Sequence, residues 1–66
     1  MDFTFALACK NAIEKSKKIN TVCRVYRSYN AFYVNSDKER GDEGTFGWLF
    51  MAYPGGRKVL SLAHNN

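Results

Sequence analysis

TFGWLFMAY, residues 45–53, is the stretch that decides the fold, because it predicts a β-strand that is apolar on both of its faces. Successive side chains of a strand point to opposite faces of the sheet. The even-numbered residues would form one face and the odd-numbered residues the other: Phe46, Trp48, Phe50 and Ala52 against Leu49, Met51 and Tyr53. Strands of this kind usually lie between two layers, so the layer that covers this one decides the architecture.

The residues that follow predict a hairpin and a further strand. PGG (54–56) supplies turn chemistry, because proline fixes φ and Gly56 can take a left-handed position. RKVLSLA (57–63) then predicts a strand that returns antiparallel to the first. HNN (64–66) is expected to be a frayed tail.

A second hairpin is expected upstream. TVCRVYRS (21–28) and AFYVN (31–35) are rich in strand-forming residues, and SYN (28–30) joins them as a turn. The next segment, SDKERGDEG (36–44), is charged and contains glycines, which is typical of a loop.

Residues 2–18, DFTFALACKNAIEKSKK, predict a helix. Asp2 or Thr4 can cap its N-terminus by accepting a backbone N–H bond. Lysines crowd the last turn, where cations complement the helix dipole. One face follows helical spacing and carries mostly small side chains: Phe5, Ala8, Cys9, Ala12, Ile13 and Ser16.

The small side chains of this helical face favour large rings as packing partners. We therefore expect Phe46, Trp48 and Phe50 to lie under the helix. The alternative places the odd-numbered face of 45–53 under the helix and leaves Trp48 near solvent.

The sequence thus predicts an α+β fold in two layers, in which one N-terminal helix packs on a four-stranded antiparallel meander in the order α-β-β-β-β. Residues 1–66 would form a single small domain. One helix can cover only one face of the sheet, so a contiguous apolar or aromatic patch should remain exposed. Patches of more than a few hundred Å² usually mark a contact surface.

Composition agrees with a dense core and a basic surface. Hydrophobic residues make up 45% of the chain and aromatic residues 15%, and ten Lys and Arg against six Asp and Glu give a net charge of +4. This charge is compatible with a nucleic acid or an acidic partner. The simpler explanation involves no ligand: lysines in the last turn of the predicted helix account for much of the excess positive charge.

We expect a cytoplasmic protein that is not bound to a membrane. No stretch approaches the roughly 18 apolar residues of a membrane span, and Asp2 stands where a signal peptide would carry basic residues. Cys9 and Cys23 form no CxxC motif, so we expect reduced thiols that act as small buried hydrophobes. Whether they ever pair is left open.

No pattern predicts an enzyme, a metal site or a small-molecule cofactor. His64 is the sole histidine, and GxSxG, HExxH and Walker motifs do not occur. The acidic residues of segment 36–44 miss the EF-hand spacing, which needs oxygen ligands at alternate positions.

The expected function is therefore non-enzymatic binding by a small module or regulator, of the accessory kind that bacteria and phages make. Its exposed aromatic and apolar sheet face would dock on a protein partner or on its own copy, forming a dimer. The alternative is single-stranded RNA or DNA binding, in which rings stack on bases and cations hold the backbone. The candidate binding residues are Arg24, Tyr26, Arg27, Tyr33, Trp48, Arg57 and Lys58.

Overall fold

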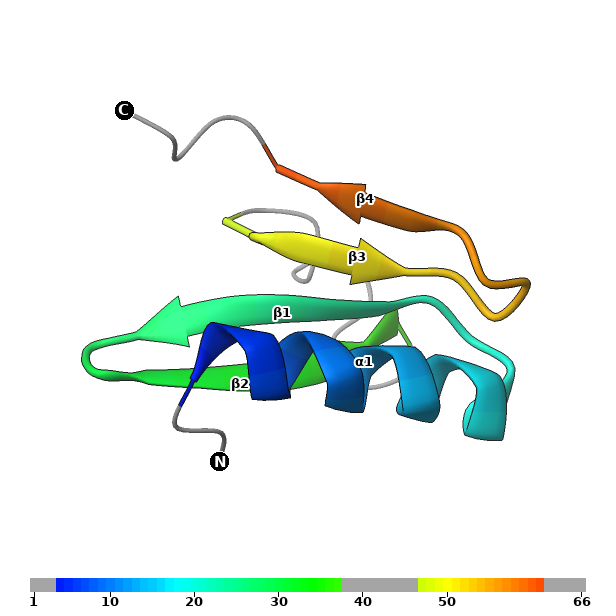
Figure 1. Cartoon of the computed structure of the whole chain (residues 1–66), viewed down its shortest axis with the longest axis horizontal. Coiled ribbons are helices and arrows are strands. Elements are labelled where there is room, and N and C mark those ends of the chain that lie inside the picture. The colour runs from blue at the N-terminus through cyan, green and yellow to red at the C-terminus, as the bar shows by residue number, and fades with distance from the viewer. Residues whose placement is uncertain (1–3, 38–46, 62–66) are drawn as a thin grey trace.

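The computed structural model shows one helix packed on a four-stranded antiparallel sheet (Figure 1). The structure describes residues 4–37 and 47–61. Its elements are α1 (Phe5–Ile19), β1 (Cys23–Ser28), β2 (Ala31–Ser36), β3 (Phe50–Ala52) and β4 (Lys58–Leu60). The predicted α+β class and the α-β-β-β-β order are confirmed. The predicted tail 64–66 and most of the predicted loop 36–44 lie outside the described residues.

The strand order of the sheet differs from the predicted meander. It is β2-β1-β3-β4, so β3 pairs with β1 and not with its neighbour in sequence, β2. In this pairing Cys23 lies opposite Ala52, and Val25 lies opposite Phe50. Cys23, Val25 and Ala52 are almost completely buried. The two central positions thus go to β1 and β3, where strands flanked on both sides can bury their apolar side chains most fully.

Helix α1 spans Phe5–Ile19, where the sequence predicted residues 2–18, and a capping residue marks each end. The Oγ1 of Thr4 accepts a hydrogen bond from the backbone N–H of Leu7 at 3.1 Å, which confirms one of the two predicted caps. At the other end Asn20 adopts a left-handed conformation with φ of 54°, and its N–H donates to the carbonyl of Ser16. The predicted small-residue face lies against the sheet, where Ala8 and Ala12 are fully buried.

Both predicted turns are present. Ser28 pairs with Ala31, which leaves two residues to connect β1 and β2. The first of them, Tyr29, has a φ of 57°. In the second turn the N–H of Gly56 donates to the carbonyl of Tyr53 at 3.0 Å. Gly56 has a φ of 103°, a conformation that residues with a Cβ rarely adopt, as the sequence predicts.

The helix covers the side of β3 that carries Phe50 and Ala52, as predicted from the even-numbered residues. These two side chains join Cys23 and Val25 of β1 in the core. Met51 lies on the opposite side of the sheet. Phe46, which was expected beside Phe50, lies outside the described residues. Trp48 was also expected under the helix, but it is half-buried and is not among the residues that pack on the core.

Leu49 corrects the predicted alternation along this stretch. Its backbone N–H donates to the carbonyl of Val25 at 2.8 Å, while Phe50 is the register partner of the same Val25. Two consecutive residues therefore oppose one, which is how a β-bulge interrupts alternation. Leu49 faces the helix side together with Phe50, whereas strict alternation placed it on the other side.

Candidate functional site

Helix α1 is too narrow to cover the whole sheet. A helix is about 10 Å wide and neighbouring strands lie about 4.8 Å apart, so one helix covers two or three strands. The main contacts of α1 are with β1, β2 and β3, and β4 forms the edge of the sheet beyond β3 (Figure 1). On β4, Leu60 pairs with Phe50 and so lies on the helix side, where it is 51% exposed.

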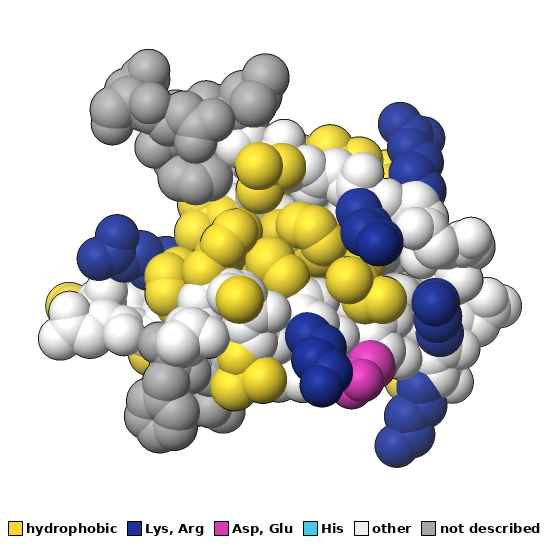
Figure 2. Space-filling model, in the orientation of Figure 1, with side chains coloured by type: hydrophobic (Ala, Val, Ile, Leu, Met, Phe, Trp, Pro, Cys, Tyr) yellow, Lys and Arg dark blue, Asp and Glu magenta, His cyan; other side chains and the backbone are white. Residues whose placement is uncertain are grey.

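An apolar surface is therefore open beside the helix. Figure 2 shows this side of the molecule, with apolar side chains gathered in its centre and Lys and Arg side chains around them. Phe50 connects the surface across the layers, because it pairs with Leu60 and its ring contacts that of Phe5 edge-on at 6.5 Å. We call this surface the open face and define it by the partly buried Phe5, Phe32 and Leu49 and the exposed Leu60, with the buried Phe50 beneath them.

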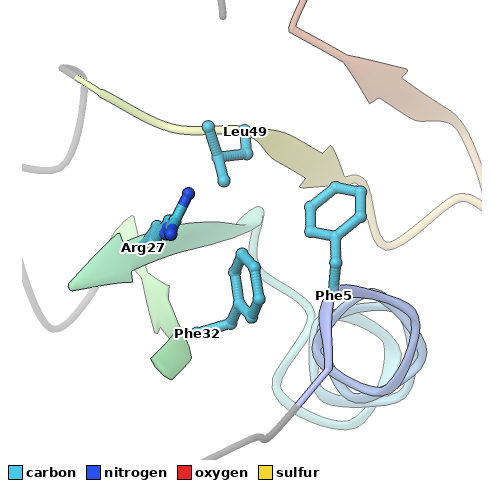
Figure 3. Close-up of a pocket in the computed structure, with 4 residues that line it drawn as sticks. All are labelled: Phe5, Arg27, Phe32 and Leu49. Atoms are coloured by element: carbon cyan, nitrogen blue, oxygen red, sulfur yellow. The ribbon is translucent and has the colours of Figure 1, made fainter. Parts of the chain in front are cut away.

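One end of the open face is hollowed. The hollow has a volume of about 270 Å³ and is lined by Phe5, Arg27, Phe32 and Leu49. The rings of Phe5 and Phe32 lie 5.6 Å apart and tilted by 55°, and Leu49 points toward them from β3's side (Figure 3). Each of these three side chains is only partly buried. The hollow thus has apolar walls, formed by side chains at the edge of the hydrophobic core.

Arg27 supplies the charge of the hollow. It pairs with Phe32 across the β1–β2 hairpin, which puts both side chains on the helix side of the sheet. Its Nε donates to the carbonyl of Tyr29 at 3.2 Å, and the residue is exposed. The remaining guanidinium nitrogens give it further donors in a planar fork suited to a carboxylate. Lys58 lies on the same side of the sheet, opposite Ala52.

The opposite side of the sheet carries a second cluster. Tyr26 and Tyr33 are register partners whose rings stack with centroids 5.7 Å apart. Arg24 forms an ion pair with Asp37. Tyr26 is only 5% exposed and Met51 only 9%, so the centre of this side is buried. The exposed apolar patch expected on the face away from the helix is therefore not found at its centre.

The candidates named from sequence do not form one site. Arg27 and Lys58 lie on the helix side, whereas Arg24, Tyr26 and Tyr33 lie on the other.

No strand pairing assigns the other two candidates, Arg57 and Trp48, to either side of the sheet. The Arg57 guanidinium lies over the Tyr53 ring, 5.2 Å from its centroid. Trp48 precedes β3 and is half-buried. Whether any of the seven candidates binds a partner stays a prediction.

Sequence reasoning missed the apolar walls of the hollow. Phe5 was assigned only to the helical core face, Phe32 only to a strand, and Leu49 to the wrong side of the sheet. The one signal of this site in the sequence was Arg27, which by strand alternation points to the opposite side of the sheet from Arg24 and Tyr26. The walls come together only because α1, β2 and β3 all reach the same end of β1.

The thiols and acidic groups offer no metal centre among the described residues, where no three His, Cys, Asp or Glu side chains lie together. No disulfide joins Cys9 and Cys23, which lie on α1 and β1 respectively. Burial raises the pKa of the Cys9 thiol, because a low-dielectric environment disfavours the thiolate. The neutral thiol of Cys9 thus serves as part of the apolar packing around the core.

The fold and the open face define a small two-layer α+β protein with an incompletely covered sheet. Comparison with family models, with curated proteins and with solved structures finds no match for this chain. Within residues 4–37 and 47–61, no helix combines the length and the apolar character of a membrane span.

Proposed function

We propose that this protein is a non-enzymatic binding module that docks its open face on another protein. The observation that carries the proposal is the uncovered strip beside α1, where Leu60 is half-exposed next to Phe50 and the hollow opens between Phe5 and Leu49. Exposed apolar strips on a small protein are typical of contact surfaces. The docking face of this proposal lies on the helix side of the sheet.

Charge favours a different protein over a second copy. A symmetric dimer brings the same patch together with itself, so Arg27 and Lys58 of one protomer would approach those of the other. The acidic residues in the described part of the chain are Glu14 and Asp37, and Asp37 already pairs with Arg24. Like charges across an interface cost binding energy, so self-association through this face is disfavoured.

Single-stranded nucleic-acid binding is the second candidate, and the ring positions weigh against it. Base stacking needs aromatic faces that are open to the ligand. Tyr26 is buried and its ring is already stacked on Tyr33. Arg24 on the same side is engaged by Asp37. What supports this candidate is the positive net charge of +4 alone.

Site-specific photo-crosslinking tests the proposal. A benzoylphenylalanine residue in place of Leu60 samples the open face, and the same residue in place of Lys18 samples an exposed position in the last turn of α1. The two variants are produced and irradiated in the cells that naturally make the protein. We expect a discrete protein adduct from position 60 and none from position 18.

The mass of the adduct separates the alternatives. An adduct of twice the chain mass, together with a dimer in sedimentation, would show self-association in place of a separate partner. Adducts of equal yield from both positions, or none from position 60, would overturn the proposal. Fluorescence anisotropy with short RNA and DNA oligomers at two salt concentrations tests the second candidate, because phosphate contacts make affinity fall steeply with salt.

The proposal includes a cytoplasmic location and an accessory or regulatory role of the kind found in bacteria and phages. It is supported by Cys9 and Cys23, which form no disulfide, since reduced cysteines are usual in the cytoplasm. A small module with one open face suits a regulator that acts by occupying another protein's surface.

A further inference from the structure

We infer that the partner presents an acidic segment, which inserts one large apolar side chain into the hollow and sets a neighbouring carboxylate on Arg27. This inference rests on the proposed function and adds the chemistry of the partner. It joins two observations: apolar walls at Phe5, Phe32 and Leu49, and an exposed guanidinium at the same hollow.

The size of the hollow suits one side chain. Pockets that enclose drug-sized ligands have volumes of about 300–1,000 Å³ and bury most of the ligand. At about 270 Å³ this hollow is smaller, and its lining residue Arg27 is exposed on the helix side. Interfaces between proteins often depend on one aromatic or aliphatic anchor that fills such a depression.

The walls of the hollow favour an apolar anchor. Phe5 and Phe32 present ring edges and faces at a tilt of 55°, a geometry in which a third ring can pack against both. Leu49, which directly precedes β3, closes the other side (Figure 3). Filling the hollow would remove the exposed parts of all three side chains from water, which is favourable at about 25 cal/mol per Å² of apolar surface.

The positive charge around the hollow favours acidic residues next to the partner's apolar side chain. Arg27 and Lys58 are the charged side chains that the strands place on the helix side, and both are positive. Figure 2 shows Lys and Arg side chains around the apolar centre. Complementary charge steers encounter and rejects basic partners. An acidic segment therefore fits this face better than a neutral or basic one.

The test is an NMR titration of the full-length chain with a defined peptide. The probe has blocked ends and a single phenylalanine flanked by aspartate and glutamate. One control peptide carries alanine in place of phenylalanine, and another carries lysines in place of the acidic residues. We expect the probe to shift the backbone amides of Phe5, Arg27, Phe32 and Leu49 and both controls to bind more weakly. Affinity should fall between about 0.01 M and 0.15 M salt, where the Debye length shortens from about 30 Å to about 8 Å.

Matched variants separate the two parts of the inference. Arg27→Gln should weaken the probe about two- to fivefold, as for an exposed ion pair, whereas Lys18→Gln removes the same charge elsewhere and should have a smaller effect. Leu49→Ala should weaken it about tenfold, in the range of an anchor contact. Leu7→Ala is its control, because Leu7 is 42% exposed on α1 but does not line the hollow.

Four results would overturn the inference: no binding of the probe, equal binding of the basic peptide, equal effects of the Arg27 and Lys18 variants, or shifts confined to the Tyr26 and Tyr33 side. A single-stranded oligonucleotide that shifts the hollow amides more strongly than the probe would also overturn it. If crosslinking from position 60 still yields a partner, the proposed function stands and only the chemistry assigned to that partner is lost. If position 60 yields none, the docking face itself is wrong.

Discussion

The ring of Tyr26 lies on the ring of Tyr33, with 5.7 Å between their centroids and 19° between their planes. The two residues are register partners in β1 and β2, so their stacking is fixed by the hairpin. This contact uses two of the rings that the sequence offered as binding residues. It stabilises the side of the sheet that faces away from α1.

A double-mutant cycle should detect this contact. Tyr26→Leu and Tyr33→Leu should each lower the free energy of unfolding, and the double variant should lose less than the sum of the two. We expect a coupling of about 0.5–1.5 kcal/mol, the usual worth of an aromatic pair beyond its area. Urea denaturation followed by circular dichroism measures it. Additive losses would show that the stacking contributes nothing of its own.

Substitution of the turn residue Tyr29 should be able to stabilise the fold. It is 93% exposed and has a φ of 57°, in the left-handed region that Asn tolerates and β-branched residues do not. Tyr29→Asn should raise the free energy of unfolding by roughly 0.5–1 kcal/mol, and Tyr29→Val should lower it by about 1 kcal/mol or more. Thermal unfolding of the two variants checks this order, and the reverse order would contradict the turn geometry.

Close packing of the helix on the sheet predicts a penalty for larger side chains. Ala12 is fully buried at the helix–sheet contact. Ala12→Leu should lower the free energy of unfolding by about 1–3 kcal/mol, because extra methylenes force neighbouring groups to move. Leu7→Ala, on the exposed part of the same helix, is the control and should cost much less. If chemical denaturation shows equal losses of unfolding free energy for the two variants, the helix packs more loosely on the sheet than the structure shows.

The raised pKa of the Cys9 thiol predicts a pH dependence of stability. The folded state holds the thiol proton more tightly than the unfolded chain, in which a cysteine has a pKa of about 8.5. The Cys9 contribution to stability is therefore complete below that pH and is lost as the pH rises through the folded pKa. The free energy of unfolding of the wild type, minus that of Cys9→Ala, should therefore decrease as the pH rises above about 8.5.

Alkylation gives an independent reading of the same group. The thiolate is the nucleophile, so burial that raises the pKa of Cys9 slows its reaction with iodoacetamide. Native protein should react at Cys9 more slowly than urea-unfolded protein at the same pH, as measured by mass spectrometry of the peptide. Reaction as fast in the native state would mean that Cys9 is not part of the packed layer.

Local signals determined the elements of this protein. The spacing of small residues gave α1 and its buried face, Thr4 supplied its cap, and the residues around Tyr29 and Gly56 gave the two turns. Each of these depends on side chains a few residues apart, so the chain itself specifies them. The even-numbered face of 45–53 was also assigned correctly to the helix at Phe50 and Ala52, because small helical side chains pack against large ones.

Only the tertiary structure decided how the strands are ordered and where the open face lies. The pairing of β3 with β1 joins segments that are distant in sequence, and no local period encodes it. The bulge at Leu49 interrupted the alternation, placed Leu49 on the helix side and so completed the hollow with Phe5 and Phe32. The sequence showed that one helix could not cover this sheet. Pairing and the width of the helix decided that the uncovered strip lies beside α1, with Arg27 at its end.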